Sequence, residues 1–309
     1  MILFLMAAIQ AGTPLLLATL GEIITERTGN LNLGVEGMML IGAVFGFLVG
    51  HSTEMPFLAI AAGAASGAVA AGIYAFVTVT LRANQVVTGL ALTIFGTGVS
   101  GFIGKYLMGF VLSEGFIDQF EPIAIPLLSK IPLIGPVLFN QNYFVYLAYL
   151  LAIASWFYIE RTRFGLNLRM VGENPAAADA SGINVSLYKY VHIMIGGALC
   201  GLGGAYLSLV YVPAWQENLT AGRGWIAIAL VIFSQWNTLY ALFGSYLFGM
   251  LGILGFRLQQ FNIPYAQYIF SAMPYVITIT VLIITSMQKG KGSNEPEGLS
   301  VPYFREDRH

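Results

Sequence analysis

The sequence predicts an all-α polytopic membrane protein with about nine transmembrane helices, within a range of 8–10. Of its 309 residues, 57% are hydrophobic and only 9% are charged. Soluble domains carry about a quarter charged residues, so this chain has too few charges to cover a water-exposed surface of its size. The formal net charge of −1 also argues against a nucleic-acid partner, because such binding needs a basic footprint. Membrane lipid is therefore the environment that we expect.

Seven apolar runs are long enough to cross a bilayer, which takes roughly 20 residues of helix. They contain no Asp, Glu, Lys or Arg, and they cover residues 2–20, 57–81, 86–104, 143–159, 191–212, 240–256 and 265–286. Two shorter runs cover residues 38–50 and 225–236. Each follows a pair of glycines, namely Gly34 and Gly37, and Gly222 and Gly224. A short run crosses only if its flanks extend the helix, and counting both gives nine crossings.

The arginines and lysines of the loops predict the orientation, because they favour the cytoplasmic side of a membrane. They gather in residues 160–190 and in the tail at residues 287–309. We expect the chain in the cell (inner, cytoplasmic) membrane, with both of these segments on its cytoplasmic side. Residues 105–142 and the N-terminus are then expected on its external side. The expected division is a transmembrane domain over residues 1–286, with a cytoplasmic loop at 160–190, followed by a polar cytoplasmic tail.

The ends of the spans carry charged and aromatic residues that we assign to the membrane interface. Glu22, Glu26 and Arg27 are expected to form an interfacial charge cluster. Aromatic belts are expected at the tryptophans near span ends, which are Trp156, Trp215, Trp225 and Trp236. The long runs themselves hold no carboxylate, which argues against a proton relay inside the membrane.

The sequence contains no recognisable catalytic, nucleotide-binding or metal-binding motif. It lacks a Gly-x-x-x-x-Gly-Lys-Ser/Thr loop, so it has no recognisable cradle for the phosphates of ATP. The three histidines, His51, His192 and His309, lack metal-ligand spacing, and the single Cys200 allows no intrachain disulfide. We therefore expect no enzyme activity, no cofactor and no metal.

A short helix is predicted in the loop at residues 160–190. Asn174 suits the N-cap and Pro175 the first helical position, while Gly182 suits the left-handed residue that ends a helix. Alanines of high helix propensity lie between them at Ala176, Ala177 and Ala178. A helix of about two turns is marginal in water by itself. It is either a connector against the membrane or a knob that docks into another protein.

Four stretches of this chain resemble one family. Residues 172–184 are similar to the cytoplasmic coupling loop of ribose-permease-like subunits of ABC importers. Residues 26–39, 83–91 and 222–230 resemble the nucleoside and simple-sugar subgroup of these permeases, within the branched-chain amino acid and sugar permease family. The resemblance implies a type II ABC importer-like fold and three kinds of partner: ATP-binding cassette subunits, a second permease, identical or related, and an extracytoplasmic substrate-binding protein. It also implies that the segment from Glu173 to Gly182 receives the stroke of the ATPase.

Polar residues beside the glycine-headed short runs are candidates for the translocation pathway. They are Asn30, Asn32, Glu36, Asn84 and Gln85. Irregular backbone at membrane depth is tolerated only where protein or a water-filled cavity covers it. The alternative is that these side chains cap helices and tie the spans together.

These candidates are mostly neutral, which suits an uncharged, hydrogen-bonding solute. The family resemblance implies a nucleoside, with a simple sugar or a riboflavin-like vitamin next. A self-sufficient secondary transporter or channel for a small neutral solute is the alternative function, although such a protein has no need of a docking helix.

Overall fold

The computed structural model describes residues 1–132, 134–258 and 294–305, together with residues 272–273, 276–277, 279–280 and 283. Within these residues, seven helices are long and apolar enough to cross a membrane. The predicted all-α membrane fold is therefore confirmed. The seven are α1 (Ile2–Glu26), α2 (Val35–Thr53), α3 (Pro56–Ala75) continued by the π-helical turn η1 (Phe76–Thr80), α4 (Gln85–Leu107), α7 (Tyr143–Arg161), α10 (Val185–Tyr206) continued by η3 (Leu207–Tyr211), and α12 (Thr238–Leu258).

The two short runs have different outcomes. The first belongs to α2, because its flanking residues continue the helix to 19 residues and a full crossing length. The second forms α11 (Arg223–Phe233), which has 11 residues and is too short to cross alone. The predicted crossing at residues 265–286 lies mostly outside the described residues, so the number nine stays a prediction.

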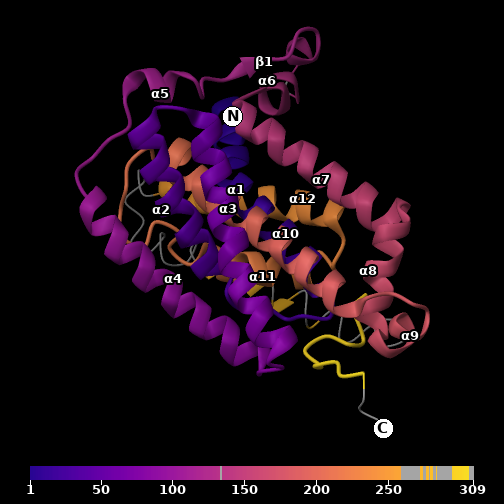
Figure 1. Cartoon of the computed structure of the whole chain (residues 1–309). Helices are drawn as coiled ribbons and strands as arrows, with labels where there is room; N and C mark the ends of the chain where they lie inside the picture. Colours follow the sequence, from indigo (N-terminus) through magenta and orange to yellow (C-terminus); the bar gives the residue numbers. More distant parts are fainter. Residues whose placement is uncertain are drawn as a thin grey trace.

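Helices α1, α2, α3 and α10 form the centre of the molecule (Figure 1). α10 packs against the other three, α4 packs on α2, and α12 packs on α1. Glycine permits this close approach, since a Cβ added at Gly201 of α10 would collide with the Gly63 carbonyl of α3, and one at Gly42 of α2 with the backbone of Gly201. Backbone-to-backbone contact at small residues is a common way to hold helices together in lipid.

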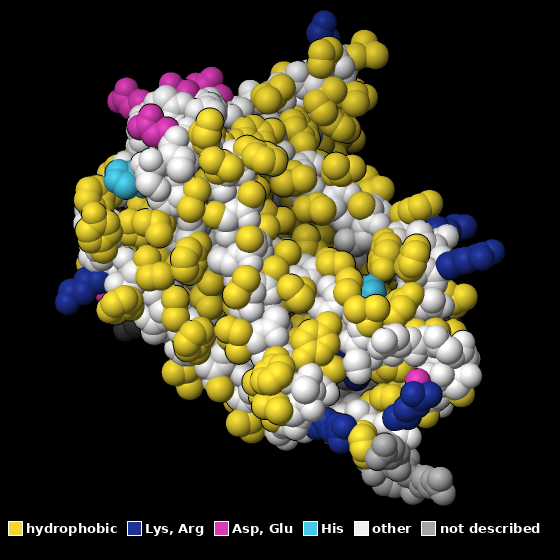
Figure 2. Space-filling model, in the orientation of Figure 1, with side chains coloured by type: hydrophobic (Ala, Val, Ile, Leu, Met, Phe, Trp, Pro, Cys, Tyr) yellow, Lys and Arg dark blue, Asp and Glu magenta, His cyan; other side chains and the backbone are white. Residues whose placement is uncertain are grey.

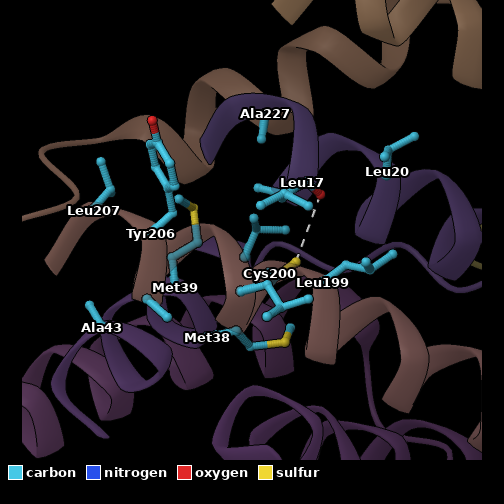
Figure 3. Close-up of a cluster of buried hydrophobic side chains, with 14 of the residues drawn as sticks. Leu17, Leu20, Met38, Met39, Ala43, Leu199, Cys200, Tyr206, Leu207 and Ala227 are labelled. Carbon is cyan, nitrogen blue, oxygen red and sulfur yellow. Dashed lines mark hydrogen bonds between the residues drawn. The ribbon is translucent and has the colours of Figure 1, made fainter. Parts of the chain in front are cut away.

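An apolar core fills the space between α1, α2, α10 and α11 (Figure 3). Leu17, Met38 and Met39 are fully buried there, and Cys200 lies among them with its thiol 3.7 Å from the Ala18 carbonyl oxygen. The core is made of residues from all four helices, so it fixes their mutual arrangement.

Short elements cover the two ends of the bundle. At one end lie α5 (Glu114–Asp118), the strand pair β1 (Ile123–Ala124) and β2 (Asn140–Gln141), the 3-10 turn η2 (Leu128–Lys130) and α6 (Ile134–Phe139). The strands are antiparallel, with Ile123 paired to Gln141 and Ala124 to Asn140. At the other end lie α8 (Arg163–Glu173) and α9 (Pro175–Ala180).

The two ends differ in charge and in which terminus they carry. The N-terminus lies at the α5 end and residues 294–305 lie beside α9 (Figure 1). Asp and Glu side chains gather at the α5 end, whereas Lys and Arg are concentrated on the side of α8 and α9 (Figure 2). α8, α9 and residues 294–305 thus share one end, and α5 and the N-terminus share the other. Which end faces the cytoplasm stays a prediction.

Candidate functional site: helix α9 and the buried loop beside it

Helix α9 has the caps that its sequence predicts. The side-chain oxygen of Asn174 accepts a hydrogen bond from the N–H of Ala177 at 2.9 Å, and Pro175 is the first helical residue. Gly182 ends the helix with φ +83°, and the N–H of Ile183 reaches back to the Ala178 carbonyl at 3.1 Å. This pairing is the usual way in which a left-handed glycine closes a helix.

One face of α9 is anchored and another is open. Ala178 is buried against Val171 of α8 and Val185 of α10. The exposed residues are Glu173, Asn174, Ala176, Ala177 and Ala180. Beside them lies a groove of about 480 Å³, lined by Leu166, Arg169, Met170, Glu173, Asn174 and Ala177. The groove and the small alanine side chains together give this end a surface that a complementary knob or ridge can enter.

Helix α8 connects α9 to the interior of the membrane domain. A Cβ added at Gly172 would collide with the carbonyl oxygen of Arg27, so the two backbones are in direct contact. Arg27 begins the α1–α2 loop, residues 27–34. Arg27 is 8% exposed, and its guanidinium donates to the Trp236 carbonyl at 3.1 Å. Burial lowers the pKa of this guanidinium below its ordinary value, and the carboxylates of Glu160 and Glu173 offset part of the effect.

The α1–α2 loop is buried and held by side chains from three helices, α1, α3 and α4. Glu22 of α1 accepts from the N–H of Asn32 at 3.0 Å, and Gln85 of α4 accepts from the N–H of Leu31 at 2.7 Å. The hydroxyl of Tyr74 donates to the Leu31 carbonyl at 2.6 Å. Every one of these bonds satisfies a backbone group that has no helical partner, which a buried loop requires.

The predicted pathway residues therefore divide into buried and exposed ones. Asn30, Asn32 and Gln85 are 1–3% exposed and brace the loop. The oxygen of Asn32 also accepts from the N–H of Gly34 at 2.9 Å. Asn84 is exposed and caps α4 by accepting from the N–H of Val87 at 3.0 Å. The alternative in which these residues cap helices and tie spans together describes their observed contacts.

Glu36 has a structural partner that the sequence did not reveal. Glu36 is 5% exposed. Its carboxylate accepts hydrogen bonds from the Thr220 hydroxyl at 2.5 Å and from the N–H groups of Gly222 and Gly224 at 2.8 and 2.6 Å. The negative charge thus faces the N-terminus of α11, where orphan N–H groups and the helix dipole favour it. The only sequence signal was the glycine pair, because Gly222 takes φ +83° and Gly224 leaves room for the Glu36 backbone.

The expected interfacial charge cluster of Glu22, Glu26 and Arg27 is wrong, because all three are buried. The expected interfacial position is also wrong for two of the tryptophans. Glu22 and Glu26 lie in the last turns of α1 and are 0% and 2% exposed. The indole N–H of Trp236 donates to Glu26 at 2.5 Å, and Trp215 and Trp236 are 4% and 7% exposed. The reason is that α1 runs six residues beyond the predicted run, to Glu26, and carries its carboxylates into the protein interior.

Three named proteins are similar to the chain over most of its length. One is a protein of Haloferax volcanii that is provisionally named as a glucose ABC transporter permease. It is 42% identical to this chain, and the match covers 89% of each of the two proteins. A nucleoside ABC transporter permease of Lactococcus lactis is 36% identical over 88% of each chain. A guanosine ABC transporter permease of Bacillus subtilis is 35% identical over 98% of this chain and 96% of that protein.

A family model matches nearly the whole membrane domain. Its match covers residues 4–282, and its description is that of the permease component of a branched-chain amino acid transport system. The match, the identities above 30% and the seven spans agree with one another. This chain is a multi-pass membrane protein and belongs to the family of branched-chain amino acid transport system permease components.

Proposed function

We propose that the chain is the membrane-spanning permease subunit of an ATP-driven importer, and that it moves a neutral solute, with a nucleoside as the first candidate. The ATP is hydrolysed on separate ATP-binding cassette subunits. A second permease, identical or related, completes the pathway, and an extracytoplasmic binding protein delivers the solute. In this arrangement the C-terminus is cytoplasmic and the N-terminus is external.

The observation that carries the proposal is helix α9. It is a short, fully capped helix with an exposed alanine face beside a groove, at the end of the molecule where Lys and Arg gather. A self-sufficient carrier has no use for such a docking surface, whereas relatives at 35–42% identity are named as ABC transporter permeases.

A chain of contacts connects α9 to the helices inside the membrane, through which its movement can be transmitted. Movement of α9 carries Gly172 at the end of α8, which touches the backbone of Arg27. The α1–α2 loop joins the first helix to the second, and Glu36 at the start of α2 is bonded to α11. Glu173, Asn174, Pro175, Ala176, Ala177, Ala178 and Gly182 therefore form the proposed coupling segment.

The substrate proposal rests on chemistry and on relatives. Asn30, Asn32 and Gln85 shape the wall of the pathway through the loop that they hold, and Asn84 is the exposed amide among the candidates. Of these candidates Asn84 is the exposed one, and its neutral amide favours an uncharged, hydrogen-bonding solute. Two relatives are named for nucleoside or guanosine transport and one for glucose, so glucose is the competing solute.

The test is uptake by the whole complex. The tagged chain is purified in mild detergent with the subunits that accompany it, reconstituted in liposomes with its binding protein, and supplied with labelled guanosine, uridine or glucose. We expect ATP-dependent uptake of a nucleoside, abolished by Ala177→Trp and retained in Ala177→Ser, the matched control. Solute movement by the chain alone without ATP contradicts the proposal and supports the secondary transporter or channel. ATP-dependent glucose uptake alone overturns only the substrate.

A further inference from the structure

The C-terminal strap, residues 294–305, lies along the coupling segment (Figure 1). The hydroxyl of Tyr303 donates to the Asp179 carboxylate at 2.9 Å, and Arg305 is ion-paired with the same oxygen at 3.0 Å. The N–H of Gly298 donates to the Gly172 carbonyl at 2.9 Å. The strap is thus bonded to both α8 and α9.

The same strap also contacts the membrane domain. The N–H of Ser300 donates to the Gly29 carbonyl at 3.2 Å, and the Arg27 guanidinium donates to the Asn294 carbonyl at 3.2 Å. The Arg82 guanidinium, in the turn between η1 and α4, lies 3.6 Å from the ring centre of Phe304. Segments far apart in the sequence are therefore joined by 12 residues of tail.

Helix α9 needs such support. Six residues of helix are too few to be stable by themselves in water. The Tyr303 ring packs on the cluster that buries Ala178, and the Tyr303 hydroxyl fixes Asp179 one residue further along. The strap leaves Ala176, Ala177 and Ala180 exposed, so it does not cover the face that the proposed ATP-binding subunit would contact.

We infer that the C-terminal strap is a positioning segment for energy coupling: it holds α9 in place and ties it to the α1–α2 loop, so that a displacement of α9 is passed to the membrane domain. Tyr303 is the main positioning residue, because it joins the apolar and the polar contacts of α9. The inference rests on the proposed function for its transport consequence. Its structural half, the hold on α9, does not depend on that function.

The first experiment measures the hold itself on the full chain in detergent. Hydrogen exchange of the peptide covering residues 172–184 is compared between the unaltered protein and Tyr303→Ala. We expect exchange about 10-fold faster in the variant, since local opening is controlled by such contacts. Val301→Ala is the matched control, because Val301 lies in the strap with its side chain 56% exposed. Unchanged exchange in Tyr303→Ala overturns the inference whether or not the protein transports.

The second experiment measures uptake and ATP hydrolysis by the assembled complex. We expect Tyr303→Ala to lower the amount of solute moved per ATP hydrolysed about 5-fold. Tyr303→Phe is expected to restore part of this ratio, because it keeps the ring contact and loses only the hydrogen bond to Asp179. If Tyr303 acts only in folding, uptake and ATP hydrolysis fall together, in proportion to the amount of complex that assembles. That result overturns the inference. Absence of ATP-dependent uptake in the unaltered complex contradicts the proposed function instead, while the exchange result still decides the hold on α9.

Discussion

The Glu36 carboxylate accepts a hydrogen bond from the backbone N–H of Gly224 over 2.6 Å, which joins the first turn of α2 to the first turn of α11. Two further donors, from Thr220 and Gly222, bind the other carboxylate oxygen. A helix too short to cross the membrane thus begins on a buried negative charge supplied by another helix.

Removal of this charge is expected to destabilise the fold. Glu36→Ala leaves three donors, two of them buried, without this acceptor. We expect it to lower the free energy of unfolding by about 3 kcal/mol or more, given the usual strength of hydrogen bonds to charged groups. Glu36→Gln, which keeps one acceptor oxygen, costs less. The measurement is thermal unfolding followed by a thiol-reactive dye, because Cys200 is the only cysteine and is fully buried. Equal stability of Glu36→Ala and the unaltered protein contradicts this role.

Glycines at helix contacts and glycines in open space should respond differently to substitution. Gly201→Leu is expected to prevent the packing of α10 on α3, because even a Cβ collides with the Gly63 carbonyl. Gly98→Ala is the control on α4, where an added Cβ has no neighbour within 4 Å among the described residues. Size-exclusion profiles in detergent should show aggregation for Gly201→Leu alone. A monodisperse Gly201→Leu protein would show that the contact is not needed.

The two adjacent amides at the start of α4 are expected to differ in effect. Gln85→Leu leaves the N–H of Leu31 without a partner in a buried loop, at a cost of about 1–3 kcal/mol. Asn84→Ala removes an exposed helix cap, which is typically worth about 1 kcal/mol. Uptake and thermal stability should both fall further in Gln85→Leu, with Ser293→Ala in the tail as the reference substitution. A larger loss of uptake in Asn84→Ala at unchanged stability would instead mark Asn84 as a substrate contact.

Orientation in the membrane is open to a direct measurement. A compartment-sensitive reporter fused after His309 is expected to read as cytoplasmic, because loop lysines and arginines favour that side. The same reporter inserted next to Pro126, at the end that carries α5, is expected to read as external. Reversed readings would overturn the assignment of α9 to the cytoplasm, and with it the coupling role.

Local features were predictable from the sequence and distant contacts were not. The caps of α9 lie within a few residues of one another, at Asn174, Pro175 and Gly182, so residue type alone indicates them. The partners of Glu36 and Glu26 lie 184–210 residues away along the chain. No periodicity or spacing connects such residues, so the sequence alone predicts a pathway or interface position for their carboxylates. Likewise, Tyr303 lies in a polar tail that carries no motif, and its role depends on where Asp179 is folded.

The glycine contacts among α2, α3 and α10 have a mechanical consequence. Where backbones touch directly, as at Gly42, Gly63 and Gly201, no side chain lies between the helices that could change rotamer and let them slide. Close-packed interiors respond to force by moving as units and not by deforming gradually. Gly37 with Gly96 and Gly12 with Gly249 attach α4 and, through α1, α12 to this group by the same kind of backbone contact. These helices are therefore expected to move as one rigid unit in any conformational change of the protein.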